Sequence, residues 1–504
     1  MSTRRGGFIS SYVDPAYSAR WRLTEQTQGI GDDAWNYNYG LINSFANSDT
    51  IATTNKFMPQ ACVIDPNDDA LYVTSYNSNV TTYGGNITKT DLSGNVYWSK
   101  EIECFYLQDM AVDSSSNIYV VGYIFVTSIY KIFIAKLDST GTILWQRIVA
   151  NGTSSSYSAL GKRIGVDSSG NVYVIGNQVL NSYSFYSSAI FKYNSSGTLQ
   201  WQKSFDSVNT SGDVFVLAMS VDSSTGDIYY AGYGVSTVSA SRTDAYYGKM
   251  NTSGTIVWSK YIPPITGTSF IINAISYLAS GSNIYLAGTH NNAAYVGIGS
   301  SLDGSISSYH KSYTNGTNTS NLAIAVEEPV DYSGDVDVYT CGSSVLSGTT
   351  RYGSIFKNTT FLGTGSVSWQ RKITTNAWPS GGTGNPTVIC SAIFVKKQYL
   401  YVVGYRNGAT IGNRTEMFGI IIPKDGSRST STIAIPSVTR NSITVGGHNM
   451  YFSTNDASET SLSPSPGNAA TYYSSVTSAH SSSTGTQAIQ NSLNSYSNLL
   501  LKVP

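Results

Sequence analysis

Charged residues are scarce in this chain of 504 residues. Only 12% of them are charged, and 30 bases balance 30 acids, whereas soluble proteins average about 25%. A chain without excess positive charge has no electrostatic footprint for nucleic acid. No apolar run approaches the roughly 20 residues of a membrane span. We therefore expect neither nucleic-acid binding nor membrane insertion, and a polar surface made of hydroxyl and amide groups.

Cysteines, histidines and targeting signals are also sparse. Four cysteines do not make a disulfide framework in a chain of this length, so buried free thiols are expected, with a bridge between Cys62 and Cys390 as the alternative. The amino-terminal bases lack the apolar stretch of a secretory signal. The histidines have no metal-ligand spacing, so no metal or cofactor is expected at His290, His310, His448 or His480.

A segment repeated seven times is the strongest signal that is present. Its cleanest copy is DSSGNVYVIG (Asp167 to Gly176), followed by IFKYNSSGTLQWQK (Ile190 to Lys203). Repeats of a few tens of residues indicate solenoids, propellers or arrays. Two landmarks fix the count. The first is a glycine that ends a strand, at Gly122, Gly176, Gly232, Gly288, Gly342 and Gly404, with Ser75 in the first copy. The second is an aromatic residue after a turn glycine with a base two positions later, at Trp98, Trp145, Trp201, Trp258, Tyr309 and Trp369.

Each copy predicts four short strands. In the third copy these are residues 162–166, then VYVIG, SAIFKY and LQWQKSF, joined by turns of Asp, Asn, Ser and Gly. The sequence therefore predicts an all-β fold, a seven-bladed β-propeller over residues 57–435. The repeated tryptophans should occupy equivalent positions between neighbouring blades. The seventh copy keeps Gly404 and a PKDGS turn but has no aromatic residue.

Two segments lie outside the predicted ring. Residues 1–56 contain two tryptophans and a possible short helix over residues 18–28. Residues 436–504 begin with two strand-like pieces and continue as a Ser-, Thr- and Asn-rich arm, with Asp456, Glu459 and Lys502 as the only acids or bases from residue 455 onward. Such weakly charged arms are typical of segments that become ordered on a partner.

The first 35 residues resemble a leader found on virion structural proteins of marine bacteriophages, including those of cyanobacteria. The matching segments are RRGGFIS, from Arg4, and ARWRLTEQTQGIGDDAW, from Ala19, although Asn36 stands where the leader has proline. The repeats separately resemble the seven-bladed β-propeller family over roughly residues 57–433, a family that implies no single activity. The leader precedes unrelated domains, which implies docking on other virion proteins. Its docking residues here would be Ile9, Trp21, Leu23 and Trp35. The alternative is an ordinary amino-terminal strand and helix packed on the ring.

Tyrosines in variable loops are the candidates for receptor contact. Many of the 38 tyrosines belong to the repeated strands, but a few are expected in loops, where binding residues on a rigid scaffold concentrate. Aromatic faces stack on sugars, which favours a host glycan or another receptor as the ligand. The candidates are Tyr183, Tyr186, Tyr246, Tyr247 and Tyr352.

Enzyme functions find less support. The stretch from Lys136 to Trp145 resembles the docking repeat of quinoprotein propellers and the aspartate box of sialidases, but a turn followed by a packed aromatic residue explains both likenesses. The arginines are scattered, and the acidic stretch over residues 327–337 is expected to be a solvated loop edge, with cation binding as the alternative.

Together these features predict a non-catalytic phage virion protein on the exterior of the particle. The preferred role is a tail-associated fibre or receptor-binding subunit, homo-oligomeric on the particle and docked on other virion proteins. The alternatives are a capsid decoration or cement protein, a secreted bacterial propeller adhesin and, last, an enzyme.

Overall fold

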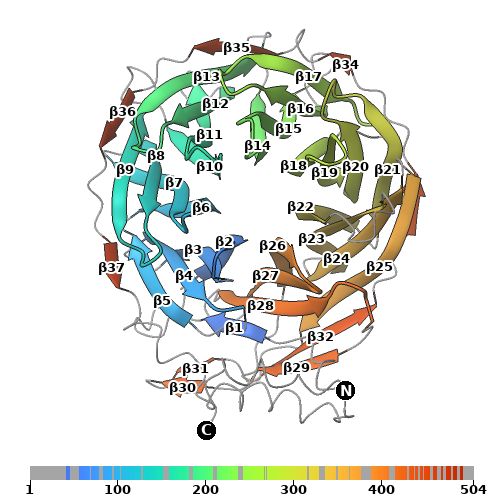
Figure 1. The fold of residues 1–504 in the computed structure, drawn as a ribbon. Coiled ribbons are helices and arrows are strands. Elements are labelled where there is room, and N and C mark those ends of the chain that lie inside the picture. Colours follow the sequence, from blue (N-terminus) through green and yellow to red (C-terminus); the bar gives the residue numbers. More distant parts are fainter. Residues whose placement is uncertain are drawn as a thin grey trace, which may run out of the picture.

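The fold is a ring of seven β-sheets, seen in a computed structural model (Figure 1). The structure describes residues 41–45, then residues 56–427 apart from short connecting stretches, of which 376–386 is the longest, and beyond 430 only the strands between 431 and 491. All its regular elements are strands. The predicted seven-bladed β-propeller is confirmed.

The blades follow one another along the chain. Each has its first strand at the central channel, and each strand pairs antiparallel with the next. Blade one is β2 (Lys56–Ile64), β3 (Leu71–Ser78), β4 (Tyr83–Thr90) and β5 (Val96–Ile102), and blade two is β6 (Tyr106–Val112), β7 (Ile118–Val126), β8 (Ile129–Leu137) and β9 (Ile143–Ala150). Blade three is β10 (Ala159–Val166), β11 (Val172–Leu180), β12 (Phe185–Tyr193) and β13 (Leu199–Ser207), and blade four is β14 (Val214–Val221), β15 (Ile228–Val235), β16 (Thr243–Met250) and β17 (Ile256–Ile262). Blade five is β18 (Phe270–Leu278), β19 (Asn283–His290), β20 (Ala293–Ser300) and β21 (Ile306–Thr314), and blade six is β22 (Thr317–Glu327), β23 (Asp335–Ser347), β24 (Thr350–Phe361) and β25 (Thr364–Thr375). Blade seven has β26 (Thr387–Lys396), β27 (Tyr399–Asn407) and β28 (Thr415–Pro423).

The outer strand of blade seven comes from the amino-terminal part of the chain. Strand β1 (Leu41–Phe45) pairs antiparallel with β28, in the place that the fourth strand holds in the other blades. This explains why the seventh sequence copy has no aromatic landmark: the chain after β28 leaves the blade. It also differs from the expected boundary at residue 56, because residues 41–45 belong to the ring.

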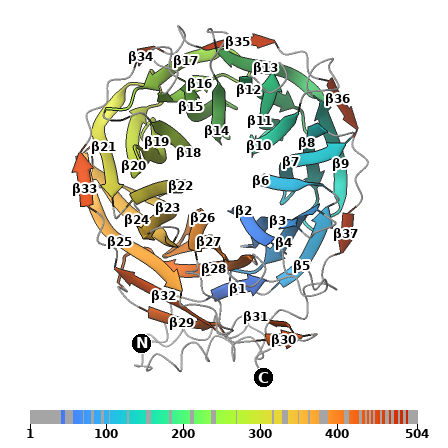
Figure 2. The same cartoon turned by 180° about the vertical axis from the view of Figure 1, so that it is seen from behind.

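The carboxy-terminal arm runs around the outside of the ring. Strands β32 to β37 pair in turn with the outer strands of blades six, five, four, three, two and one, so the arm passes the blades in reverse order (Figure 2). We call these six strands the belt: β32 (His448–Thr454), β33 (Ser458–Ser461), β34 (Gly467–Asn468), β35 (Tyr473–Thr477), β36 (Ser481–Thr484) and β37 (Ile489–Asn491). The arm was expected to be ordered by a partner, whereas these strands are ordered on the chain's own blades.

Three short strands precede or accompany the belt. Strand β29 (Ser431–Ile435) pairs with β32 on its outer side, and β30 (Val438–Arg440) forms a hairpin with β31 (Ile443–Val445). An exposed sheet edge is a template for pairing with other chains. The belt and β1 cover the outer edge of every blade and so remove this template.

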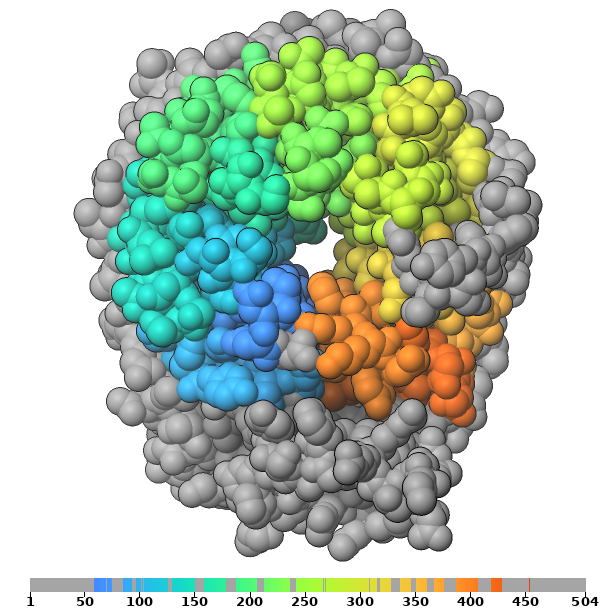
Figure 3. Space-filling view, in the orientation of Figure 1, coloured from blue at the N-terminus to red at the C-terminus, as the bar shows by residue number. Residues whose placement is uncertain are grey.

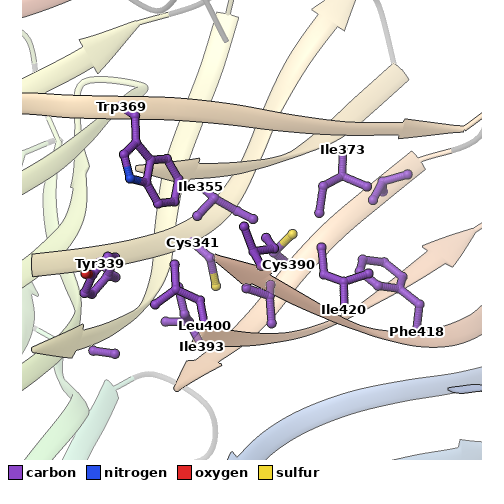
Figure 4. Close-up of a cluster of buried hydrophobic side chains, with 14 residues drawn as sticks. Tyr339, Cys341, Ile355, Trp369, Ile373, Cys390, Ile393, Leu400, Phe418 and Ile420 are labelled. Atoms are coloured by element: carbon purple, nitrogen blue, oxygen red, sulfur yellow. The ribbon is translucent and has the colours of Figure 1, made fainter. Parts of the chain in front are cut away.

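The hydrophobic core consists of clusters between successive blades. Side chains alternate along each strand, and each face of a blade meets a neighbouring blade, so both faces are apolar. Between blades six and seven, for example, Trp369, Ile355 and Cys341 pack against Cys390 and Phe418 (Figure 4). All four cysteines are free, so the alternative bridge between Cys62 and Cys390 is excluded. Burial raises the pKa of the Cys62 thiol to about 12, with a smaller contribution from the negative charge of Asp109.

Candidate functional site

The two faces of the ring are built differently. One face carries the turn between the first and second strands of each blade and the turn between the third and fourth. The opposite face carries the loops between the second and third strands and the connections between blades. On the first face, the turns between third and fourth strands are regular, five residues long in blades one to five. The turn that contains Asp167 illustrates those between first and second strands. Its carboxylate accepts hydrogen bonds of 2.9 Å from the backbone N–H groups of Ser169 and Asn171, and one of 3.0 Å from the hydroxyl of Tyr173. The repeated DSSGNVY is therefore a turn with its own cap.

The repeated tryptophans bind five of the blades to the next one. The indole N–H of Trp145 in blade two donates a hydrogen bond of 3.0 Å to the carbonyl of Ser195 in blade three. Gly197 in that turn has a φ of 75°, and a Cβ there would lie 2.7 Å from the indole. Arg147 donates a hydrogen bond of 2.6 Å to the Gly197 carbonyl. The same indole-to-carbonyl bond recurs from Trp98 to Ser139, Trp201 to Thr252, Trp258 to Ser301 and Trp369 to Lys424. The prediction of equivalent tryptophans between blades is confirmed.

A second repeated group on this face joins strands within a blade. A lysine of the third strand lies over a tyrosine ring of the second strand and opposite the tryptophan of the fourth. In blade six, Lys357 lies 5.5 Å from the ring centre of Tyr339, pairs in register with Trp369, and forms a salt bridge of 2.8 Å with Asp337. Glu327 pairs with Lys424 of blade seven at 2.7 Å. The two acids of the predicted acidic stretch that have described side chains thus make structural ion pairs.

Three of the five tyrosines predicted to lie in loops are buried in strands. Tyr246 and Tyr247 lie in β16 and are 0% exposed, and Tyr352 lies in β24 and is 2% exposed. The prediction that they contact a receptor from loops is wrong, because both faces of a blade are covered. Tyr246 packs in the cluster between blades three and four and Tyr247 in the one between blades four and five.

The other predicted binding residues are Tyr186, Tyr183 and the docking residues of the amino-terminal segment. Tyr186 lies in β12, near the loop end of blade three, while Tyr183 lies outside the described residues. The predicted docking residues Ile9, Trp21, Leu23 and Trp35, and the possible helix near them, also lie outside the described residues.

The loop face carries an aromatic cluster in blade two that sequence reasoning missed. It consists of Phe105, Tyr106, Tyr123, Phe125 and Tyr130, and we call it the blade-two aromatic cluster. Tyr106 and Tyr123 face each other across β6 and β7 with ring centres 5.3 Å apart and planes 4° apart. Tyr130 meets Tyr123 nearly edge-on, at 5.4 Å and 82°. The signal in the sequence was the pair FY where β6 begins and the spacing Y-x-F at the end of β7, which no other copy has at these places.

The central channel is open in the space-filling view (Figure 3). The first strand of every blade has a bulge at the same place, and the residue after the bulge is alanine in five blades, at positions 61, 218, 274, 323 and 392. In blades two and three it is Asp109 and Arg163. Such bulges re-aim side chains and are frequent beside functional sites.

Asp109 and Arg163 place opposite charges at the seam between blades two and three. The carboxylate of Asp109 accepts a hydrogen bond of 3.0 Å from the backbone N–H of Ile164, and burial raises its pKa against the opposing effect of the Arg163 charge. The neighbouring bulge residue is Lys162, whose pKa is lowered to about 8 by burial and by Arg163. Three titratable groups therefore lie in the innermost strands at one seam.

The histidines with described side chains are core residues. His310 is buried, its Nδ1 is hydrogen-bonded to the hydroxyl of Tyr295, and burial lowers its pKa to about 4. His290 accepts a hydrogen bond from the backbone N–H of Ile265. Among the described residues, no group of three or more His, Cys, Asp or Glu is placed to hold a metal ion. In the same part of the chain, no helix is long and apolar enough to cross a membrane.

Comparison with known proteins gives only structural matches. No family model and no curated protein matches the chain. Similar solved structures include the Dos1 propeller, with 11% identity, a TM-score of 0.40 and coverage of 76% of this chain and 94% of that one. Sqt1 from Chaetomium thermophilum has 11% identity, a TM-score of 0.36 and coverage of 75% and 99%. The Penicillium chrysogenum alpha-L-arabinanase has 12% identity, a TM-score of 0.40 and coverage of 77% and 98%. Enzymes and other proteins share this architecture, so these likenesses leave the activity open.

Proposed function

We propose that this chain is a non-catalytic structural protein of a bacteriophage particle that displays its propeller outward as a tail-associated fibre or receptor-binding subunit. The observation that carries the proposal is the difference between the two faces of the ring. One face carries the turns between third and fourth strands, which are five residues long in blades one to five and, in blades two to five, accept the indole hydrogen bonds of the preceding blade. The other face carries the connections between blades, which range from two residues to eleven. Binding residues usually lie on variable loops that a rigid scaffold holds in place.

Two further features support display on a particle. The belt and β1 cover the outer edges of the blades, which protects a protein held at high local concentration from edge-to-edge association. The leader resemblance of residues 1–35 supports docking on other virion proteins, because that segment precedes the ring. In this arrangement the amino-terminal segment attaches the chain and the loop face meets the host.

Purified particles that contain this chain provide the test. Electron microscopy with an antibody against the propeller should label the tail, and excess purified propeller should reduce adsorption of the particles to host cells. Labelling in many copies over the capsid shell, with normal adsorption and lower resistance to heat or osmotic shock after removal of the protein, would instead indicate a capsid decoration protein. Hydrolytic or redox activity of the purified chain would contradict the non-catalytic part of the proposal.

A further inference from the structure

The blade-two aromatic cluster is partly exposed, at a place where the fold does not need aromatic residues. None of its five rings is buried, and Phe125 is 53% exposed. In blade three the pair that corresponds to Tyr106 and Tyr123 is Leu160 and Asn177. In blade six the corresponding pair is Ser320 and Ser343. The repeat therefore folds without aromatic residues at this position.

The cluster continues the core between blades two and three outward to the loop face. Tyr119 and Val121 of β7 pack in the core cluster at this seam, and Tyr123 and Phe125 follow on the same side of the strand because side chains alternate. Ile124, between them, faces the opposite seam and is buried there. At the far side, the backbone N–H of Tyr130 donates a hydrogen bond of 3.2 Å to the Ser158 hydroxyl of blade three. The cluster thus lies at the loop-face end of the seam between blades two and three.

The rings form a stack with one ring standing edge-on to it, and Phe125 is the most exposed of the five residues. Tyr106 and Tyr123 are parallel, Phe105 is stacked on Tyr123 at 5.6 Å and 26°, and Tyr130 stands across both Tyr123 and Phe105, at 82° and 67°. Ligand sites combine aromatic walls with a few polar groups that fix orientation. Here the polar groups are the three tyrosine hydroxyls.

From this chemistry we infer that the blade-two aromatic cluster binds a saccharide. The C–H face of a pyranose packs on an exposed aromatic ring such as that of Phe125, while phenolic hydroxyls exchange hydrogen bonds with sugar hydroxyls. An apolar peptide would leave the tyrosine hydroxyls without a role, which makes it the less suitable occupant. The inference rests on the proposed function and gives the receptor a chemical class.

Saturation-transfer NMR on the full chain provides a direct test, with cellopentaose, laminaripentaose, mannopentaose and tetra-N-acetylchitotetraose as probes. At least one probe should show transfer, and Phe125→Ala should weaken its binding about tenfold, the equivalent of one aromatic contact. Phe125 lies outside the core, so this variant should keep the thermal midpoint of the parent.

The matched control is Tyr233→Ala in blade four. Tyr233 stacks on Phe215 at 4.9 Å, in the same cross-strand position as Tyr123 on Tyr106, and its loss should leave saccharide binding unchanged. Equal loss of binding in both variants, or no transfer to any probe, overturns the inference. Binding of 1-anilinonaphthalene-8-sulfonate that depends on Phe125, without binding of any saccharide, would indicate an apolar protein partner and would also overturn it.

Adsorption experiments separate this inference from the proposed function. If particles with Phe125→Ala adsorb normally although the isolated variant no longer binds the saccharide, the site stands and its role in attachment fails. If the purified propeller blocks adsorption, and Phe125→Ala blocks it equally well and also keeps its saccharide binding, the receptor-binding role stands and the saccharide site fails.

Discussion

The indole N–H of Trp258 in blade four donates a hydrogen bond of 3.1 Å to the carbonyl of Ser301 in blade five. The bond joins the outer strand of one blade to the turn of the next one, and the indole lies beneath Gly304 in that turn. The repeated Gly and Trp of the sequence are thus two halves of one contact between blades. Their role is in assembly of the ring.

Replacement of Trp258 should destabilise the ring. Trp258 is 9% exposed, and truncation of a buried tryptophan costs about 3–5 kcal/mol. We expect Trp258→Ala to lower the free energy of unfolding by this amount in urea denaturation. Val257, its neighbour in β17, is 52% exposed, and Val257→Ala should change the free energy by less than about 0.5 kcal/mol. Similar values for the two variants would contradict the contact between blades.

A side chain at Gly304 should disturb the same contact. Gly304 has a φ of 71°, and an added Cβ would lie 2.5 Å from the indole of Trp258. Gly304→Ala should therefore cost about 1–3 kcal/mol, and the cost should decrease when Trp258 is already alanine. Gly281→Ala is the control, because its Cβ would meet only the movable amide of Asn283. Additive costs in the double variant would show that the indole is not responsible.

The amino-terminal boundary of the ring can be tested by two deletions. Removal of residues 1–40 keeps β1 and should leave the thermal midpoint unchanged. Removal of residues 1–50 also removes Leu41–Phe45, the strand that pairs with β28 in blade seven, and should lower the midpoint by several degrees. Equal midpoints, measured by calorimetry, would show that β1 contributes nothing to ring closure.

Acid should destabilise the protein through His310. Its pKa is lowered from 6.5 to about 4 by burial, so between these pH values the unfolded chain takes up a proton that the folded chain does not. The free energy of unfolding should therefore fall as the pH decreases from about 6.5 to 4. His310→Gln should reduce this slope, as measured by urea denaturation at several pH values. An unchanged slope would assign the acid sensitivity to other groups.

The repeated part of the fold could be predicted from the sequence because each element has a chemical signature. Asp167 caps a turn, Gly197 has a positive φ and Trp145 packs on it, and these residue types recur at a regular spacing. The landmark glycine at the end of the second strand has a similar origin. At Gly122, an added Cβ would lie 1.8 Å from the carbonyl oxygen of Tyr106.

The belt and the candidate site were not predictable in this way. Belt strands such as Gly467–Asn468 and Ser481–Thr484 are short and polar, and their pairing depends on an edge that only the folded ring provides. Tyr246 and Tyr247 were misplaced because they were assigned to a variable loop, whereas they lie in β16, both faces of which are covered by neighbouring blades. The blade-two aromatic cluster depends on residues from three strands that only the fold brings together.

The position of the belt at the end of the chain also has a consequence for folding during synthesis. Residues 431–491 are synthesised after the ring, and at about 5–20 residues per second their translation takes roughly 3–12 s. During this interval the outer edges of blades one to six are not yet covered. Blade six is covered first and blade one last. A ribosome that stalls in this region would hold a ring whose uncovered outer strands can pair with strands of other proteins. Pauses between codons 431 and 491 should therefore determine the yield of soluble protein more strongly than pauses within the blades.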